Sequence, residues 1–313
     1  MILSLLEHIP GSVLYVMAMD RKCSEILDRC NLDNVFVECI EDLESPELDK
    51  ARSDRSRAEF CWTCGSFVTS YFLHKYSLPH ITYLDSDLMF FSSPECVLDD
   101  LEAENASVGL TPHFTDQTLF GRYCVQYVYF KNNESGVAAL DWWKGECLKW
   151  CYSKLEDGKY GDQKYLDYLG ERFENVREIS NRGVGIAYWN MNSYSFGNGR
   201  VYYSGQSWPI VFFHYSGFVV SIEDKRLCLR HTMYINDTVR ETFVRPYADL
   251  LKSVYEKYLG LSVDSISIRP LNPVKHAIKH LAYILMRFLP IEKIDAVFLK
   301  LKYRERKSPY SER

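Results

Sequence analysis

The sequence lacks any uninterrupted apolar run of about 18 residues, the length that a helix needs to cross a membrane. Its start also lacks the basic segment of a secretory signal, and Glu7, His8 and Pro10 interrupt the apolar residues there. We therefore expect neither a transmembrane helix nor a cleaved leader in this sequence. The expected location of the protein is the cytoplasm.

An excess of positive charge is missing as well. The 313 residues contain 37 Lys and Arg against 42 Asp and Glu, which gives a formal net charge of −5. Because no basic field covers the chain as a whole, nucleic acid is not an expected partner. With 47% hydrophobic and 25% charged residues, the composition is that of a folded domain and not of a disordered chain.

The charge is nevertheless unevenly distributed. Residues 269–313 hold eleven Lys or Arg and four acidic residues, a net +7, which leaves −12 on residues 1–268. Within this tail Val274, Ile278, Leu281 and Leu285 recur at helical spacing, and the basic residues lie off their face. Basic amphipathic helices bind anionic membranes, so residues 273–307 are predicted to contact the inner face of the membrane. Packing of this helix on the acidic body is the alternative.

Short apolar runs alternate with segments of helical periodicity in the rest of the chain. Strands are expected at 13–19, 35–40, 81–84, 107–111, 125–131 and 210–214, and helices at 1–9, 23–32, 58–76, 135–154 and 163–169. This alternation predicts an α/β domain over residues 1–260, with a mostly parallel sheet and helices on both faces, followed by a basic tail over 261–313. No element is assigned to the polar stretch 41–57.

Two carboxylates directly follow the strand predicted at 81–84. Asp85 and Asp87 are two positions apart, so in extended backbone they point to the same side. They therefore converge at the carboxyl end of a strand, where open α/β sheets bind their ligands. Two converging carboxylates suit a hard cation such as Mg²⁺ or Mn²⁺, which often bridges a diphosphate. The alternative is a turn with two solvated acids.

Six short motifs follow one another in an order that resembles the GT-A-fold glycosyltransferases. They are Arg55-x-x-x-Glu59-Phe60-Cys61-Trp62-Thr63-Cys64, Tyr83-Leu84-Asp85-Ser86-Asp87, Val128-Tyr129-Phe130-x-Asn132, Gly161-Asp162-Gln163-Lys164-Tyr165-Leu166, Trp189-Asn190 and Phe213-His214-Tyr215-Ser216-Gly217. The resemblance covers roughly residues 1–250. It is to the retaining glycogenin and lipopolysaccharide hexosyltransferase group, and more closely to a bacterial set of nucleotide-diphospho-sugar transferases.

The resemblance implies a metal site and a donor site. Asp85, Asp87 and His214 would hold Mn²⁺ or Mg²⁺ on the diphosphate of the donor. Arg52 and Arg55 would contact that diphosphate, because a guanidinium group matches phosphate oxygens. Asp85 would share in this contact, and Gly217 would let the backbone approach a phosphate closely. For the two arginines, a solvated helix start is an equally good interpretation.

Four further residues receive roles from the same resemblance. Asp162 and Gln163 would act beside the reacting carbon of the donor sugar, or else they cap a helix at a Gly-Asp turn. Trp189 and Asn190 would contact the sugar or the acceptor, with a buried core position as the alternative for Trp189.

The resemblance thus implies an enzyme that moves a hexose from a nucleotide-diphosphate sugar, with UDP-sugars favoured, to a glycan or lipid-linked acceptor. Retention of configuration and a place in polysaccharide or lipopolysaccharide synthesis are part of this expectation. Two features depart from the pattern. Cys124-Val125-Gln126 replaces the usual Asn-x-Gly, and Met1 falls inside a helix, so the usual first strand is expected to be missing. A non-catalytic nucleotide- or carbohydrate-binding relative is the main alternative, and a metal-dependent phosphohydrolase is a third.

Overall fold

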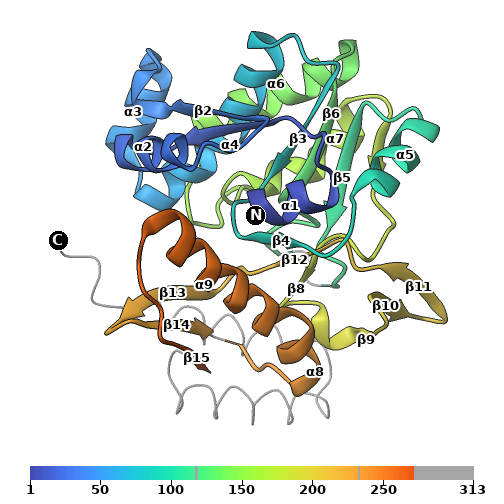
Figure 1. Cartoon of the computed structure of the whole chain (residues 1–313). Coiled ribbons are helices and arrows are strands. Elements are labelled where there is room, and N and C mark those ends of the chain that lie inside the picture. The colour runs from blue at the N-terminus through green and yellow to red at the C-terminus, as the bar shows by residue number, and fades with distance from the viewer. Residues whose placement is uncertain (117–118, 232, 271–313) are drawn as a thin grey trace.

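The structure of the protein is a computed structural model that describes residues 1–116, 119–231 and 233–270 (Figure 1). The tail over 271–313, with its predicted amphipathic helices and membrane contact, lies outside the described residues. Among the helices that the structure describes, none combines the length and the apolar character needed to cross a bilayer.

A four-stranded sheet forms the centre of the fold. Its strands are β3 (His80–Leu84), β6 (Tyr123–Lys131), β5 (Val108–Pro112) and β7 (Val176–Glu178), in that order. Strand β6 is antiparallel to both of its neighbours, whereas β5 and β7 are parallel. Three strands therefore point one way, with β6 reversed between two of them. The α/β class is confirmed, and the sheet is mixed.

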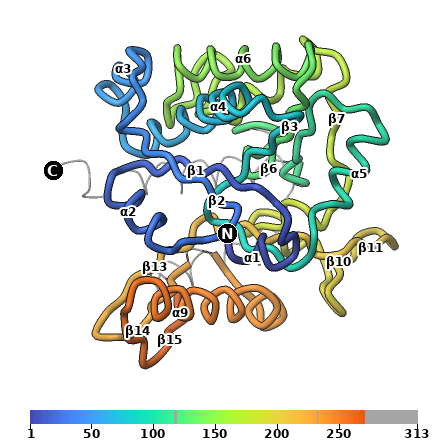
Figure 2. Tube along the Cα trace, turned by 45° about the horizontal axis from the view of Figure 1, so that its top comes forward, coloured from blue at the N-terminus to red at the C-terminus, as the bar shows by residue number. Residues whose placement is uncertain are grey.

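Helices cover both faces of this sheet, as predicted. On one face lie α4 (Arg57–Lys75) and α6 (Glu134–Lys149), which pack against each other (Figure 2). On the other face lie the shorter helices α1 (Ile2–His8) and α5 (Glu95–Ala103).

Strand β6 shows why both faces must be covered. Its residues Val128 and Phe130 are fully buried against the α4 and α6 side, and Phe130 stacks on Trp143 of α6. The alternate residues Tyr127 and Tyr129 are buried in the cluster that contains α1 and α5. Because side chains alternate between the two faces of a strand, a strand with buried apolar residues on both faces needs a cover on each face.

A second, smaller sheet precedes the central one in the chain. Strand β1 (Leu14–Ala18) pairs in parallel with β2 (Val35–Cys39), and α2 (Arg21–Cys30) makes the connection. The side chain of Asp20 caps α2 by accepting a hydrogen bond from the Cys23 backbone N–H at 2.8 Å. The helix and both strands confirm the predictions for this region within one to two residues.

A helix lies in the polar stretch to which no element was assigned. Helix α3 (Pro46–Asp54) follows the short turn η1 (Ile40–Asp42), begins with Ser45 as its cap and has Pro46 in its first turn. Only Leu48 and Ala51 of this helix are buried. Two apolar positions are too few to make a visible helical period, although Ser-Pro is a recognisable start signal.

The remaining elements surround the lower end of the central sheet in Figure 1. One small sheet has the order β4 (Leu88–Phe90), β12 (Phe212–His214), β8 (Ile186–Ala187). A second joins β9 (Ser195–Gly197), β10 (Arg200–Tyr203) and β11 (Gln206–Pro209). Short helical segments between the strands are η2 (Gln163–Tyr168), α7 (Leu169–Arg172) and η3 (Met191–Ser193). The segment predicted as a helix at 163–169 is thus largely a 3₁₀ helix.

The last described part of the chain is a sheet and a helix. Strands β13 (Phe218–Glu223), β14 (Arg226–His231) and β15 (Ser265–Pro270) are joined by α8 (Asp237–Val239), the π-helical turn η4 (Arg240–Val244) and α9 (Arg245–Leu259). Because β15 pairs along its whole length with β14, the folded body extends past the domain boundary expected at residue 260.

Two glycines of helix α6 provide a test of this packing. A Cβ on Gly136 would lie 2.2 Å from the Lys131 carbonyl oxygen and 2.8 Å from that of Ser107, whereas a Cβ on Gly145 would meet nothing within 4 Å. Gly136→Ala should lower the free energy of unfolding by roughly 1–3 kcal/mol through overpacking. Gly145→Ala should raise it by about 0.5–1 kcal/mol. Urea unfolding measures both values, and equal effects of the two substitutions would contradict this packing.

Candidate metal centre and active-site cleft

A cleft of about 2040 Å³ opens along one side of the molecule. Its lining comes from segments that are far apart in the sequence, including the ends of β3 and β12, the loop after β5 and the start of η2. Asp85, Asp87 and His214 all line this cleft. The predicted metal ligands are therefore brought together at a place that a large ligand can reach.

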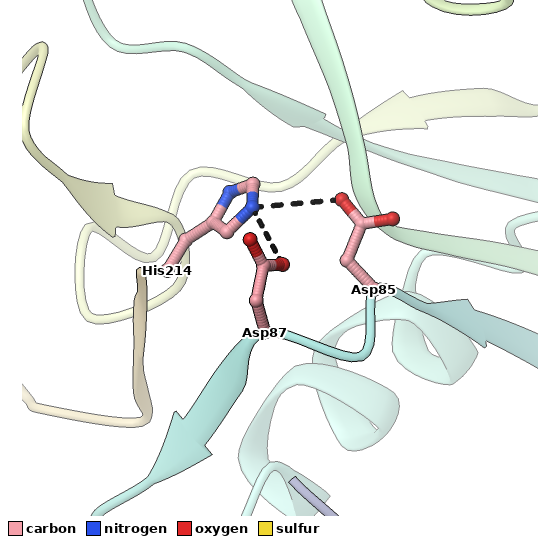
Figure 3. A group of neighbouring side chains, drawn as sticks. All are labelled: Asp85, Asp87 and His214. Carbon is pink, nitrogen blue, oxygen red and sulfur yellow. Dashed lines mark ion pairs between the residues drawn. The ribbon is translucent and has the colours of Figure 1, made fainter. Parts of the chain in front are cut away.

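The three side chains converge closely (Figure 3). The Nε2 atom of His214 lies 3.0 Å from Oδ1 of Asp87 and 3.7 Å from Oδ2 of Asp85. One ligand atom from each residue lies within 4.8 Å of the others. The hydroxyl of Tyr83 donates a hydrogen bond to the other oxygen of Asp85 at 3.0 Å, which orients that carboxylate.

Strand pairing explains why these residues meet. Strand β3 ends at Leu84, and β4 begins at Leu88, so Asp85 and Asp87 occupy the bend between them. Strand β12 is antiparallel to β4, with His214 opposite Leu88, and the Tyr215 backbone N–H donates to the Asp87 carbonyl at 2.8 Å. The register of this pair therefore places the imidazole beside the second carboxylate.

Burial and mutual attraction have opposite effects on the pKa values of Asp85, Asp87 and His214. Burial raises the pKa of Asp85, against the attraction of His214. Burial would also raise the pKa of Asp87, but the hydrogen bond and charge of His214 lower it below its usual value. Burial would lower the pKa of His214, yet the hydrogen bond that its imidazole donates to Asp87, together with the interaction with Cys124, raises that pKa well above the usual value. These shifts favour a protonated imidazole beside an ionised Asp87.

The chemistry of this group fits a divalent cation. Two ligand atoms bound to one ion at about 2.0–2.2 Å lie about 3 Å apart when they subtend a right angle, close to the separation of His214 Nε2 and Asp87 Oδ1. Two carboxylates and one imidazole suit Mn²⁺, and the carboxylates suit Mg²⁺. An ion bound here would take the place of the proton on His214.

Asp162 and Gln163 also line the cleft. Asp162 is 5% exposed, and burial raises the pKa of its carboxyl well above the usual value, with the charge of Asp85 adding to the rise. The indole N–H of Trp143 donates to the Asp162 carbonyl oxygen at 2.9 Å and holds this turn against α6. The amide nitrogen of Gln163 donates to the Phe120 carbonyl at 2.7 Å. No bond from the Asp162 side chain that caps η2 is present in the described structure.

Trp189 stands beside the metal group. It follows β8, which pairs in parallel with β12, and its ring lies edge-on to His214 with ring centres 5.4 Å apart. Trp189 lines the cleft, and its buried indole N–H has no hydrogen-bond partner among the described residues. An unpaired buried donor is costly, so this N–H is a candidate for contact with a ligand.

Asn190 is buried and makes hydrogen bonds within the fold, and its contact with the sugar or the acceptor stays a prediction. It is 1% exposed and is absent from the cleft lining among the described residues. Its side-chain oxygen accepts from the Ala187 N–H, and its side-chain nitrogen donates to the carbonyls of His113 and Gly185, all at 2.9 Å. The amide is used to hold the loop after β8 in place.

Arg55 is likewise held by partners within the fold, and its contact with the diphosphate stays a prediction. Its side chain is 2% exposed. The guanidinium donates to Thr63 and to the carbonyls of Cys147 and Leu148, the last two at 2.8 and 2.6 Å. A charged group with these partners ties the start of α4 to the end of α6. The motif match could not show this, because the partners are backbone carbonyls far along the chain.

Arg52 and Gly217 also lie outside the cleft lining in the described part of the chain. Arg52 is exposed on α3, with its guanidinium 5.2 Å from the centre of the Phe60 ring. Gly217 has a φ of +80°, in the region that favours glycine. It closes the turn in which Phe218 N–H donates to the Tyr215 carbonyl. Its neighbour Ser216, and not Gly217, lines the cleft.

The structure adds His113 and Cys124 to the site. Both line the cleft, and His113 lies edge-on to Trp189 with ring centres 5.2 Å apart. Burial would raise the pKa of the Cys124 thiol, but the charges of His113 and His214 lower it to about 7. His113 follows the carboxyl end of β5, the same kind of position that drew attention to Asp85, so the sequence carried a signal for it. Cys124 lies on the reversed strand β6, in the segment that departs from the usual Asn-x-Gly.

Competition between the proton and the metal ion gives a pH-dependent affinity. Because the pKa of His214 is raised well above its usual value, the imidazole must lose a proton to bind an ion. The affinity for Mn²⁺ should therefore increase between pH 6 and pH 8, by up to about tenfold per pH unit. Calorimetry in buffers of different ionisation enthalpy measures the affinity and the released proton. The exposed His74 gives a control, His74→Gln, that should keep this dependence. A wild-type affinity independent of pH would contradict the competition between the proton and Mn²⁺ at His214.

The two arginines make a matched pair for a stability measurement. Arg55→Met should leave the carbonyls of Cys147 and Leu148 without their charged donor, and lower the free energy of unfolding by about 2–4 kcal/mol. Arg52→Met, on the exposed face of α3, should change it by less than about 0.5 kcal/mol. Denaturant unfolding of both variants is the measurement. Equal stability of the two variants would contradict the role of Arg55 in joining α4 to α6.

The sequence of the chain is similar to those of two bacterial proteins. No family model matches the chain. The chain is 32% identical over 229 residues to the uncharacterized protein YfnF of Bacillus subtilis (strain 168), covering 68% of this chain and 75% of YfnF. It is 31% identical over 266 residues to the uncharacterized protein YfnD of the same organism, covering 80% of this chain and 83% of YfnD.

Two solved structures are similar at low identity. One is a glycosyltransferase involved in the glycosylation of the major capsid of PBCV-1, with a TM-score of 0.40 and 11% identity over 66% of this chain and 96% of that one. The other is mouse xyloside xylosyltransferase 1 in its apo form, with a TM-score of 0.43 and 12% identity over 69% of this chain and 89% of that one.

The extent of the two Bacillus alignments shows that the chain belongs to the family of YfnF and YfnD.

Proposed function

We propose that the protein is a metal-dependent glycosyltransferase of the GT-A type, which transfers a hexose from a nucleotide-diphosphate sugar to a glycan or lipid-linked acceptor. UDP-sugars are the favoured donors, and retention of configuration is the favoured outcome. One observation carries this proposal. Two carboxylates and one imidazole converge on the wall of a cleft of about 2040 Å³. The six motifs in their order support it.

The residues of the cleft have distinct roles in this proposal. Asp85, Asp87 and His214 hold the divalent ion, which when bound offsets the negative charge that develops on the diphosphate as it leaves. Tyr83 keeps Asp85 in place through its 3.0 Å hydrogen bond. The indole N–H of Trp189, buried and unpaired among the described residues, donates to an oxygen of the donor.

We assign Asp162 a hydrogen bond to the sugar or to the leaving phosphate. Burial and the charge of Asp85 raise the pKa of its carboxyl well above the usual value, which favours the neutral form that can donate this bond. Gln163 positions the turn through the Phe120 carbonyl, and we assign the contact with the sugar to its amide oxygen. The metal site, Asp162 and Gln163 all line the same cleft.

Binding of the nucleotide tests this function before any acceptor is known. UDP and GDP should be titrated with and without Mn²⁺ into the wild-type protein and the Asp87→Ala variant. We expect one nucleotide to bind only with the metal, and the variant to lose at least about 100-fold in affinity, since even outer partners of a metal site change affinity 10–100-fold. Asp99→Asn, at an exposed position on α5 outside the cleft lining, is the charge-matched control.

The outcomes separate the proposal from its alternatives. Nucleotide binding followed by turnover of a nucleotide-sugar supports the enzyme. Binding without any turnover across a panel of donors and acceptors would support the non-catalytic relative, which the unusual segment Cys124-Val125-Gln126 favours. Metal-dependent release of phosphate from simple esters would instead indicate the phosphohydrolase. Failure of both nucleotides to bind with Mn²⁺ would contradict a nucleotide-sugar site.

A further inference from the structure

Three aromatic rings from distant parts of the sequence meet on one part of the cleft lining. Trp62 of α4, Phe120 in the loop before β6 and Tyr160 in the loop after α6 all line the cleft, and all three are half-buried. The ring centres of Trp62 and Tyr160 are 6.4 Å apart, and those of Phe120 and Tyr160 are 4.5 Å apart. The fold therefore builds a row of rings with Tyr160 in the middle.

This row lies directly beside the residues to which we assign contacts with the sugar. Gly161, which precedes Asp162, has a φ of +52°, in the region that favours glycine. A Cβ on Gly161 would lie 3.4 Å from the ring of Trp62. On the other side, the amide nitrogen of Gln163 donates to the carbonyl of Phe120 at 2.7 Å. The row of rings thus begins where the sugar is expected to react.

Two exposed leucines belong to the same loops as the rings. Leu119 precedes Phe120 and is 41% exposed, and Leu155 lies in the loop of Tyr160 and is 44% exposed. Both line the cleft. Covering apolar surface inside a cleft is favourable, and sites for small molecules are lined mainly by such side chains. The three rings and the two leucines are called the apolar wall below.

We propose that the apolar wall binds the aglycone of the acceptor, an alkyl or polyprenyl chain attached to the group that receives the sugar. The acceptor is then an amphiphile, with its polar end at Asp162 and Gln163 and its chain along the wall. This inference rests on the proposed function and names the acceptor class for the same cleft.

The chemistry of the wall favours a chain over the other ligands of such a cleft. The diphosphate and the sugar of a donor are polar, and their expected contacts are the metal group, Asp162 and Gln163. A free glycan or a nucleobase can stack on aromatic faces, but neither would gain from Leu119 and Leu155. A hydrocarbon chain covers rings and leucines alike, because burial of apolar surface is non-directional.

A series of alkyl glucosides tests this inference by binding alone. Methyl, butyl, hexyl and octyl β-D-glucopyranosides are titrated by calorimetry below their micelle concentrations, with Mn²⁺ present. We expect the affinity to rise by up to about fourfold for each added CH₂ group. The rise should persist when UDP or GDP saturates the protein, because an acceptor and a donor must be bound together.

Substitution of the exposed leucines locates the chain. Leu155→Asp and Leu119→Asp each place a charge on the wall at an exposed side chain, so neither removes a core contact. Each should weaken binding of the octyl glucoside by at least about tenfold and flatten the dependence on chain length. Leu261→Asp is the matched control, because Leu261 is also 44% exposed and lies outside the cleft lining of the described residues.

The outcomes distinguish this inference from the proposed function. An affinity independent of chain length overturns the inference, and so does an equal loss in Leu261→Asp. Displacement of the octyl glucoside by the nucleotide would assign the wall to the donor and also overturn it. If a nucleotide binds with Mn²⁺ and the series is flat, the proposed function stands without the apolar wall. If the series rises but neither nucleotide binds, the apolar wall stands and the proposed function fails.

Discussion

The candidate site depends on the antiparallel pairing of β4 with β12. This pair sets His214 opposite Leu88, so that the imidazole meets the two carboxylates of the preceding bend. The same β12 pairs with β8 and thereby brings Trp189 to the edge of the imidazole. A slip of one residue in this register would turn His214 to the opposite face of the small sheet. The chemistry of the cleft thus depends on a sheet of three very short strands.

The acidic groups of the site differ in how the surroundings affect their ionisation. Asp85, Asp87 and Asp162 are three acidic groups at one cleft, and they respond differently to it. Asp87 is stabilised as an anion by His214, whereas burial favours the neutral form of Asp85 and still more of Asp162. A divalent ion would reverse this preference at Asp85. We expect the protonation of the whole group to change when metal binds.

The sequence was sufficient for the α/β class, for most elements of the first 150 residues and for the meeting of Asp85, Asp87 and His214. Strong periodicity and a carboxylate pair at a strand end carried those predictions. It was insufficient for α3, whose two buried residues make no visible period, and for the reversal of β6. The hydrogen bonds of Arg55 and Asn190 to backbone carbonyls could not be predicted either, because a motif does not show such partners.

The pairing of β4 with β12 also has a consequence for the order in which the protein folds. The two strands are far apart in the sequence, whereas β1, α2 and β2 follow one another directly and contact one another. Long-range pairs form late, because the entropy cost of closing a long loop comes before the favourable contacts of the pair. During synthesis Asp85 and Asp87 therefore emerge well before the imidazole that contacts them. The nascent chain would hold a pair of unbalanced carboxylates until β12 docks, so the metal centre should be one of the last parts of the molecule to mature.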